Sequence, residues 1–163
     1  MKQFIISSFF YFFIVYLFLP IQSWAQNDWL TQRIERAYCV ISFPSEPDFS
    51  SQPFLGWSAK DKDGQVTYLI AFIEEPNERF TTADIERFLL PSMYSNDQQI
   101  SKNYLSYEGF EAIDFLYRSN NRPVLYKKGR VVIRDHKIYV LQVLYYHDDL
   151  QNFEKFANSL SFY

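Results

Sequence analysis

The feature that most constrains the fold is an apolar stretch at residues 138–146, IYVLQVLYY. Successive side chains of a strand point to opposite faces, and here both faces are apolar. One face carries Ile138, Val140 and Leu144, and the other carries Tyr139, Leu141, Val143 and Tyr145. Such a strand must be covered on both sides. We therefore expect a sheet whose two faces both pack against other elements.

A helix is predicted directly after this strand. Its apolar positions recur at helical spacing and are Leu150, Phe153, Phe156, Ala157 and Leu160. Asp148 or Asp149 is placed to cap the first turn, where a carboxylate also interacts favourably with the helix dipole. We expect this helix to cover one face of the strand at 138–146.

The first strand of the chain is predicted at residues 36–43, RAYCVISF. One of its faces carries Ala37, Cys39, Ile41 and Phe43. Pro44 ends it, because proline removes a hydrogen-bond donor from the strand ladder. Residues 26–36 hold few apolar side chains, and we expect them to form only a short helical turn or arm that leads into the fold.

A hairpin is predicted next, between residues 54–59 and 65–74. The turn between them contains Asp63 and Gly64, a pair that readily adopts positive φ. The second arm is apolar on both faces, so it should be central in the sheet.

A helix is then predicted from a capping box, in which Thr81 and Asp84 satisfy each other's backbone donors. Its apolar face is expected to carry Ile85, Phe88 and Leu89. Pro91 should stop or kink the helix, because its ring lacks the N–H that the helix needs.

The second half of the chain predicts a meander of strands. Residues 99–107 and 110–118 pair around the turn Glu108-Gly109, and residues 124–134 precede the apolar strand. The order of elements is strand, hairpin, helix, four strands, helix. This order favours an α+β fold with an antiparallel sheet of about six to seven strands and helices packed on both faces.

The first 25 residues match a secretory signal peptide. Lys2 supplies the positive start, residues 4–19 the apolar core, and Ser23 and Ala25 the small side chains before a cleavage site. Cleavage before Gln26 would place the domain in the periplasm or outside the cell, without stable membrane insertion. The alternative is an uncleaved transmembrane anchor, because the apolar run is close to spanning length.

Residues 26–163 are expected to form a single domain, which is what their length favours. The formal net charge of the chain is −3 and falls to −4 when Lys2 leaves with the signal peptide. An acidic exported protein is a poor fit for nucleic-acid binding. Cys39 is the single cysteine, so the domain must be stabilised by packing rather than by an internal disulfide.

The two histidines do not predict a catalytic or metal site. No G-x-S-x-G or similar nucleophile turn accompanies either His136 or His147. His136 lies in a polar turn, where we expect it to be exposed. His147, Asp148 and Asp149 could offer metal ligands, but adjacent residues rarely converge on one ion, so helix capping is favoured for the aspartates.

Two further motifs also have structural explanations. The sequence from Asp61 to Gly64 begins like a calcium loop, but Phe72 stands where that loop needs a bidentate glutamate, so a hairpin turn is favoured. Cys39 shares its strand face with apolar residues, so we expect a buried thiol rather than a reactive one. We therefore predict no catalytic residue, no bound metal and no cofactor.

One charge asymmetry is a candidate binding site. Basic residues gather within residues 118–137 and are Arg118, Arg122, Lys127, Lys128, Arg130, Arg134 and Lys137. Acidic residues gather around the first predicted helix and are Glu74, Glu75, Glu78, Asp84 and Glu86. Lys128, Arg130 and Arg134 share a strand face because even numbers separate them.

We predict that Lys127, Lys128, Arg130 and Arg134 form a patch for an anionic ligand, a lipid head group or an acidic partner protein. The alternative is an ordinary solvated sheet edge, on which lysine side chains oppose aggregation.

Four elements of the sequence together resemble the PsbP-like superfamily. They are the F-P-x-x-P end of the first strand (Phe43, Pro44, Pro47), the Tyr-x-Gly-aromatic turn (Tyr107, Gly109, Phe110), the strand pair at 130–143 and the amphipathic helix that ends at 156–162. This family includes the extrinsic photosystem II subunit PsbP and small exported bacterial proteins of the DcrB type. The resemblance covers most of the mature chain and implies an antiparallel sheet sandwiched between helices.

The resemblance implies a non-enzymatic accessory or binding module of the cell envelope. The residues by which the photosystem subunit handles its cofactors have no match here, and the chain lacks the cysteine that anchors many bacterial relatives to lipid. Two alternatives remain open at this point. One is a hydrolase-like enzyme whose site is assembled from scattered polar residues, and the other is a structural protein that acts by assembly.

Overall fold

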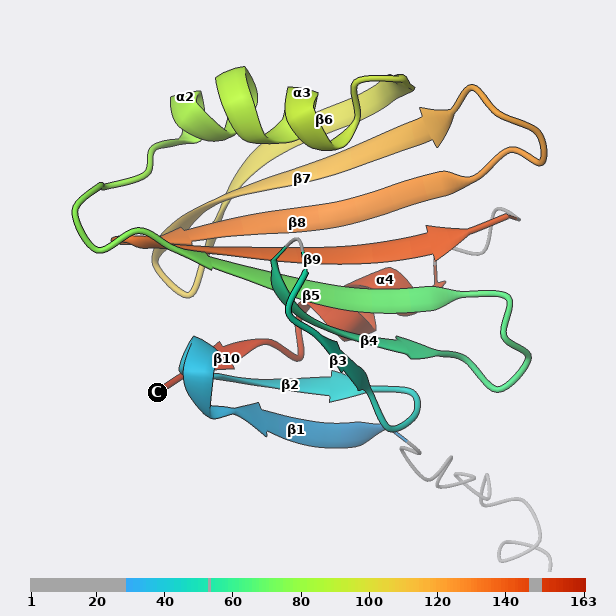
Figure 1. Cartoon of the computed structure of the whole chain (residues 1–163), viewed down its shortest axis with the longest axis horizontal. Coiled ribbons are helices and arrows are strands. Elements are labelled where there is room, and N and C mark those ends of the chain that lie inside the picture. The colour runs from blue at the N-terminus through green and yellow to red at the C-terminus, as the bar shows by residue number, and fades with distance from the viewer. Residues whose placement is uncertain (1–28, 53, 147–150) are drawn as a thin grey trace, which may run out of the picture.

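The computed structural model describes residues 29–52, 54–146 and 151–163, which form an α+β fold with two antiparallel sheets (Figure 1). The larger sheet has seven strands in the order β3-β4-β5-β9-β8-β7-β6. They are β3 (Asp48–Ser50), β4 (Leu55–Lys60), β5 (Thr67–Glu74), β6 (Asp97–Tyr107), β7 (Phe110–Ser119), β8 (Tyr126–Arg134) and β9 (Lys137–Tyr145). The predicted signal peptide and residues 147–150, including His147 and the proposed capping aspartates, lie outside the described residues.

A second, smaller sheet has the order β1-β2-β10 and was not predicted. Its strands are β1 (Leu30–Ile34), β2 (Cys39–Phe43) and β10 (Ser161–Phe162). The expectation of a short helical turn or arm at 26–36 is wrong for residues 30–34, because β1 pairs along its whole length with β2. An edge strand of this kind is stabilised by the backbone ladder of its partner, so it needs no apolar pattern of its own.

The predicted strand at 36–43 begins later than expected. A 3-10 turn, η1 (Glu35–Ala37), precedes it, and Tyr38 has the left-handed φ of 50° that breaks the extended conformation. The predicted apolar face is confirmed, since Cys39, Ile41 and Phe43 are fully buried. This strand belongs to the smaller sheet, however, and not to the larger one.

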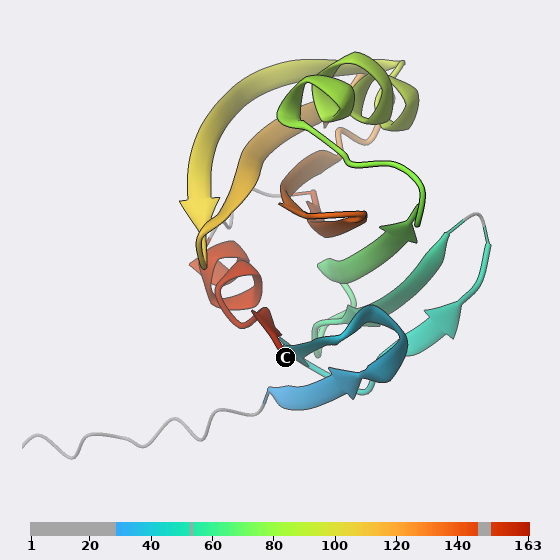
Figure 2. The ribbon, with the colours of Figure 1, turned by 90° about the vertical axis from the view of Figure 1, so that its left-hand side faces the viewer.

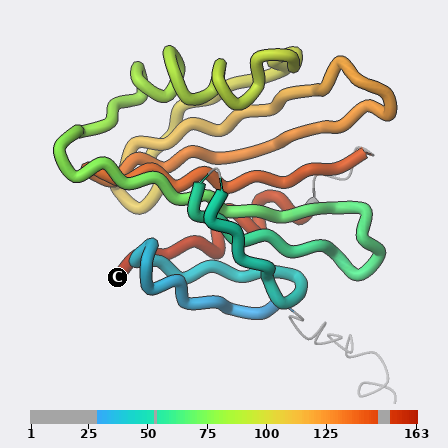
Figure 3. The backbone as a smooth tube through the Cα atoms, viewed as in Figure 1, coloured from blue at the N-terminus to red at the C-terminus, as the bar shows by residue number. Residues whose placement is uncertain are grey.

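The two predicted hairpins and the meander are confirmed. β4 and β5 form the first hairpin, and β5 lies between β4 and β9 in the sheet. β6, β7, β8 and β9 follow one another across the sheet, as the trace in Figure 3 shows. Glu108 and Gly109 have φ of 50° and 85°, which is the positive-φ geometry of a tight two-residue hairpin turn.

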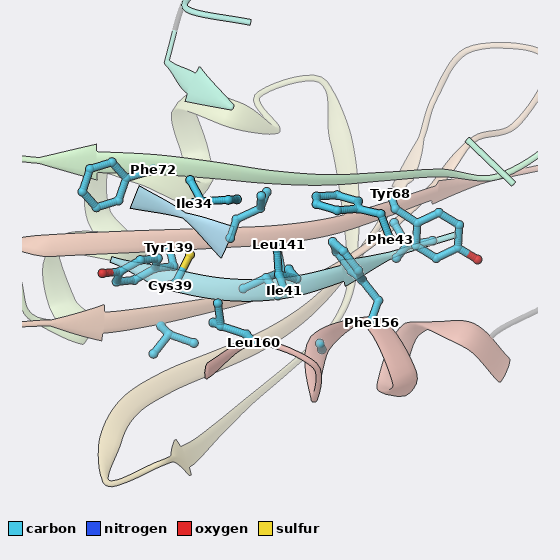
Figure 4. Close-up of a cluster of buried hydrophobic side chains, with 14 of the residues drawn as sticks. Ile34, Cys39, Ile41, Phe43, Tyr68, Phe72, Tyr139, Leu141, Phe156 and Leu160 are labelled. Atoms are coloured by element: carbon cyan, nitrogen blue, oxygen red, sulfur yellow. The ribbon is translucent and has the colours of Figure 1, made fainter. Parts of the chain in front are cut away.

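β9 is buried on both faces, as its sequence predicts. Tyr139 and Leu141 belong to a hydrophobic core with the smaller sheet and the helix α4 (Gln151–Ala157), shown in Figure 4. Ile138 and Val140 belong to a second core with the helical segment 82–93. The covering of the first face is therefore shared between α4 and an unpredicted sheet.

The helical segment 82–93 and the smaller sheet lie on different sides of the larger sheet, and Figure 2 shows the green helical segment well separated from the blue strands. The segment runs through α2 (Thr82–Asp84), η2 (Ile85–Leu89) and α3 (Leu90–Met93). Among the described residues, no helix is long and apolar enough to cross a membrane.

Candidate functional site

An open groove of about 690 Å³ lies between the helical segment 82–93 and the larger sheet. We call it the helix–sheet groove. Its apolar walls are Ile73, Phe80, Ile85, Phe88, Leu89 and Ile138, and its polar walls are Glu75, Glu78, Arg79, Asp84 and Ser92. A concave, mainly apolar surface with a few charged groups at its edge is the usual form of a binding site.

The start of the helical segment is fixed by the predicted capping box. Thr81 Oγ1 accepts a hydrogen bond from the backbone N–H of Asp84, and the Asp84 carboxylate accepts one from the backbone N–H of Thr81 at 2.9 Å. Thr81 Oγ1 also donates to the Asp84 carboxylate at 2.7 Å. This side-chain hydrogen bond first, and the backbone hydrogen bond second, lower the pKa of Asp84. The capping box therefore holds this end of the groove and keeps a carboxylate ionised there.

The middle of the segment departs from the predicted helix. η2 is a π-helix, in which the Leu90 N–H donates to the carbonyl of Ile85, five residues earlier. The buried side chains are Ile85 and Leu90, which are five residues apart across the π-helical turn, and Tyr94, which is four residues further. The prediction that Phe88 lies on the buried face is wrong, because the side chain is 60% exposed.

Pro91 neither ends nor interrupts this segment, because it lies in the first turn of α3, where a missing N–H is tolerated. The π-helical turn immediately precedes it. π-turns inside helices recur at functional sites. Here the turn leaves Phe88 exposed in the wall of the groove.

The opposite wall is held by the turn between β8 and β9. The backbone N–H of Glu75 donates to His136 O at 3.1 Å, and that of Phe80 donates to Asp135 O at 3.4 Å. The His136 imidazole also contacts the backbone carbonyl of Glu78. The loop at 75–80 is therefore tied to the sheet at both ends, so the groove is a built feature of the fold.

The rim of the groove carries more negative than positive charge. Glu75 and Glu78 are exposed and have no ion pair among the described residues. Asp84 adds a third carboxylate, whereas Arg79 is the cation that lines the groove. An acidic rim around an apolar floor selects for a ligand that combines apolar and cationic groups.

The predicted basic patch does not form one surface. Lys127 lies beside the ring of Tyr94, which belongs to the core under the helical segment, whereas Lys128 lies over Phe153 of α4. Lys127 is therefore on the opposite face of the sheet from Lys128, Arg130 and Arg134.

Three of the four predicted patch residues are already paired with carboxylates. Lys127 Nζ lies 2.6 Å from Asp97 Oδ2, and Lys128 Nζ lies 3.4 Å from Glu154 Oε1. Arg130 forms a bidentate pair with Asp114, at 2.7 and 2.9 Å, on the neighbouring strand β7. These pairings leave little free positive charge on β8.

Arg130 is a structural residue by its surroundings, since its side chain is only 4% exposed. A third bond joins its Nη1 to Asn158 Oδ1 at 2.9 Å. Burial by itself would lower the pKa of Arg130, but hydrogen bonding to Asp114 and the charges of Asp114 and Glu154 outweigh it and raise the pKa. The guanidinium is thus held charged inside the fold.

Arg134 is the exception in the predicted patch. Its guanidinium lies 5.6 Å from the Phe110 ring centroid and 5.1 Å from that of Phe162, and no carboxylate pairs with it among the described residues. It lines a small polar hollow of about 190 Å³ together with Lys137. Asp135 lines the same hollow, and Lys137 is paired with Glu74 at 3.0 Å, so the hollow carries little net charge.

The remaining chemically reactive candidates occupy structural positions. Burial, the main cause, raises the pKa of the Cys39 thiol to about 12, and the prediction that this cysteine is buried is confirmed. Asp61 accepts a hydrogen bond from the Val66 N–H at 3.1 Å within the turn of the predicted hairpin, which the pairing of β4 with β5 confirms. Within the described ranges, no group of three or more potential metal ligands comes together.

Solved structures resemble this fold. No family model and no curated protein sequence matches the chain. The solution structure of cyanobacterial PsbP (CyanoP) from Synechocystis superimposes with a TM-score of 0.65 at 13% identity, covering 83% of this chain and 92% of that one.

Two other structures align less well. A Pseudomonas aeruginosa protein of unknown function gives a TM-score of 0.46 at 11% identity, over 72% of this chain and 82% of the other. A Bacteroides thetaiotaomicron protein gives a TM-score of 0.42 at 10% identity, over 77% of this chain and 45% of the other. Both TM-scores are below 0.5, and we draw no conclusion from them. The cyanobacterial structure shows that the chain has a PsbP-like fold.

Proposed function

We propose that this chain is an exported, non-enzymatic binding module of the cell envelope, and that a segment of a partner protein binds in the helix–sheet groove. The observation that carries the proposal is the exposed Phe88 side chain in a groove with apolar walls. Burying such a ring contributes about 1.5–3 kcal/mol, so a partner that covers it gains affinity. Large aromatic side chains of this kind often dominate protein interfaces.

The surroundings of the titratable groups support a binding role over a catalytic one. Catalysis by a thiol needs the thiolate, and the raised pKa of Cys39 keeps this thiol protonated near neutral pH. His136 contacts a backbone carbonyl and is part of an exposed turn. The residues of the groove supply carboxylates and one guanidinium but no nucleophile with an adjacent base.

The proposed export rests on the N-terminal sequence. It predicts that the mature protein begins at Gln26 and is recovered from the envelope or the medium, which N-terminal sequencing after fractionation checks. A mature chain that retains Met1 in the cytoplasm would contradict export, but it would leave groove binding to be tested separately.

Photo-crosslinking from the groove tests the binding role. We would place a photoreactive phenylalanine analogue at position 88 and, as the matched control, at Tyr104, which is equally exposed but does not line the groove. In the organism that encodes the chain, we expect one discrete crosslinked partner from position 88 and none from position 104.

A second variant links the crosslink to the groove itself. Leu89→Asp changes a half-buried wall residue, and we expect it to reduce the crosslink from position 88 several-fold. Identical crosslinks from positions 88 and 104, or a crosslink from 88 that Leu89→Asp leaves unchanged, would overturn the groove as the binding surface. Circular dichroism of each variant verifies that the fold is retained.

A further inference from the structure

A second hollow adjoins the helix–sheet groove. It has a volume of about 420 Å³ and is lined in part by Phe54, Leu55, Phe72 and Pro76. Ile73 lines both hollows, so both border the end of β5. Phe54 is 44% exposed, which gives the second hollow an accessible aromatic side chain just as Phe88 does for the groove.

Two adjoining hollows favour an occupant that is longer than a typical small molecule. Each volume is within the range that accommodates one drug-sized ligand. A ligand of that kind would fill one hollow and leave the aromatic side chain of the other exposed. A polypeptide that places one large apolar side chain in each hollow would cover both.

The charged residues near Ile73 indicate the sign of the charge that the occupant carries. Glu75 and Glu78 line the groove and have no cationic partner in the described ranges. The next carboxylate, Glu74, lines the second hollow and is neutralised by Lys137 at 3.0 Å. Asp84 is a third carboxylate of the groove, and the nearby cations are Arg79 and Arg87, whose guanidinium lies 5.2 Å from the Phe88 ring centroid. The three carboxylates therefore exceed the two cations by one negative charge, which a cationic residue of the partner can neutralise.

We infer that the occupant is a partner-protein segment with two large apolar side chains and at least one lysine or arginine, lying across Ile73. This inference rests on the proposed function and adds the chemistry of the ligand. Glu75 and Glu78 receive the cation, and the two hollows receive the apolar side chains. Because the carboxylates are at the rim, their contribution is sensitive to salt.

Peptide display on the full chain tests this chemistry directly. Random peptides would be selected against the wild-type protein at low salt, and the enriched sequences synthesised for fluorescence anisotropy. We expect the enriched sequences to combine two aromatic or large aliphatic residues with a lysine or arginine. Replacing that basic residue by glutamate should weaken binding about tenfold or more, and added salt should weaken it as well.

Charge reversal on the protein supplies the matched comparison. Glu75→Lys combined with Glu78→Lys should reduce affinity for the selected peptides about tenfold or more, whereas Glu111→Lys, an exposed carboxylate that lines neither hollow, should change it less than about twofold. Phe54→Ser tests the second hollow, and we expect it to weaken binding severalfold.

The outcomes separate this inference from the proposed function. Peptides that bind with Phe88 dependence but without any dependence on Glu75, Glu78 or the basic residue would overturn the cationic occupant and leave the groove as a binding surface. Binding that Phe54→Ser leaves unchanged would overturn the occupancy of the second hollow. Selected peptides whose binding is unaffected by Phe88→Asp would overturn the proposed function itself. A fluorescent cationic amphiphile that binds the groove when no selected peptide does would overturn a polypeptide occupant.

Discussion

The basic residues of β8 and the acidic residues at the rim of the helix–sheet groove differ in what surrounds them. Lys127, Lys128 and Arg130 each lie beside a carboxylate supplied by another element of the fold. Glu75 and Glu78 lie at an open apolar groove and have no such partner among the described residues. The more conspicuous charge cluster in the sequence is thus largely neutralised, whereas the less conspicuous one faces solvent. Free charge depends on tertiary pairing, which a run of like residues does not reveal.

The largest expected effect is that of Arg130→Met. Removing the guanidinium leaves Asp114 without its bidentate partner in a partly buried position, and we expect a loss of about 3–5 kcal/mol in the free energy of unfolding, measured by urea denaturation. The double variant Arg130→Met with Asp114→Asn should recover part of this loss. A loss below about 1 kcal/mol would show that the Arg130–Asp114 pair is dispensable for stability, and it would contradict the view that the basic residues of β8 are structural.

Lys127→Ala should have the next largest effect. The carboxylate of its partner Asp97 is only 7% exposed, and an ionised buried group that loses its partner costs about 1–3 kcal/mol. Urea denaturation measures this loss in the free energy of unfolding. The control is Lys127→Ala made in a chain that already carries Asp97→Asn. An unchanged unfolding midpoint would show that water replaces the lysine without penalty.

Lys128→Ala should cost less than about 1 kcal/mol, because its partner Glu154 is 54% exposed and solvent screens the pair. Repeating the denaturation at high salt should reduce the difference from wild type further. If Lys128→Ala destabilised the fold as much as Lys127→Ala does, the partner's burial would not be what distinguishes the two pairs.

The smallest effect is expected from Glu75→Gln combined with Glu78→Gln. These exposed side chains form no ion pair in the described structure, so the free energy of unfolding should stay within about 0.5 kcal/mol of wild type. Thermal denaturation followed by circular dichroism checks this. A loss above 1 kcal/mol would show that the two glutamates stabilise the fold and are not available to a ligand.

The parts of the fold that the sequence predicts correctly are specified by local patterns. The two apolar faces of β9, the Thr81 capping box and the Glu108-Gly109 turn each depend on residues close together in the chain. β1 escaped prediction because backbone pairing to β2 stabilises it, and its own side chains are mostly exposed. No local pattern reveals such a strand.

The candidate site was harder to predict for three physical reasons. A period of 3.6 residues places Phe88 on the buried face, but the π-helical turn changes that period. The partner of Arg130 lies on β7, so finding it requires the register between β7 and β8 across an irregular connection. The acidic cluster beside the helix was visible in the sequence, but the groove that it borders forms only when the loop at 75–80 packs against the turn between β8 and β9.

The most direct test of where this protein binds is an NMR titration of the ¹⁵N-labelled chain with a peptide selected by display. We expect amide shifts to concentrate at the walls of the helix–sheet groove, around Ile73, Phe80 and Leu89, with little change along β8. Shifts concentrated at Lys128, Arg130 and Arg134, with the groove unchanged, would contradict it and return the binding site to the basic strand.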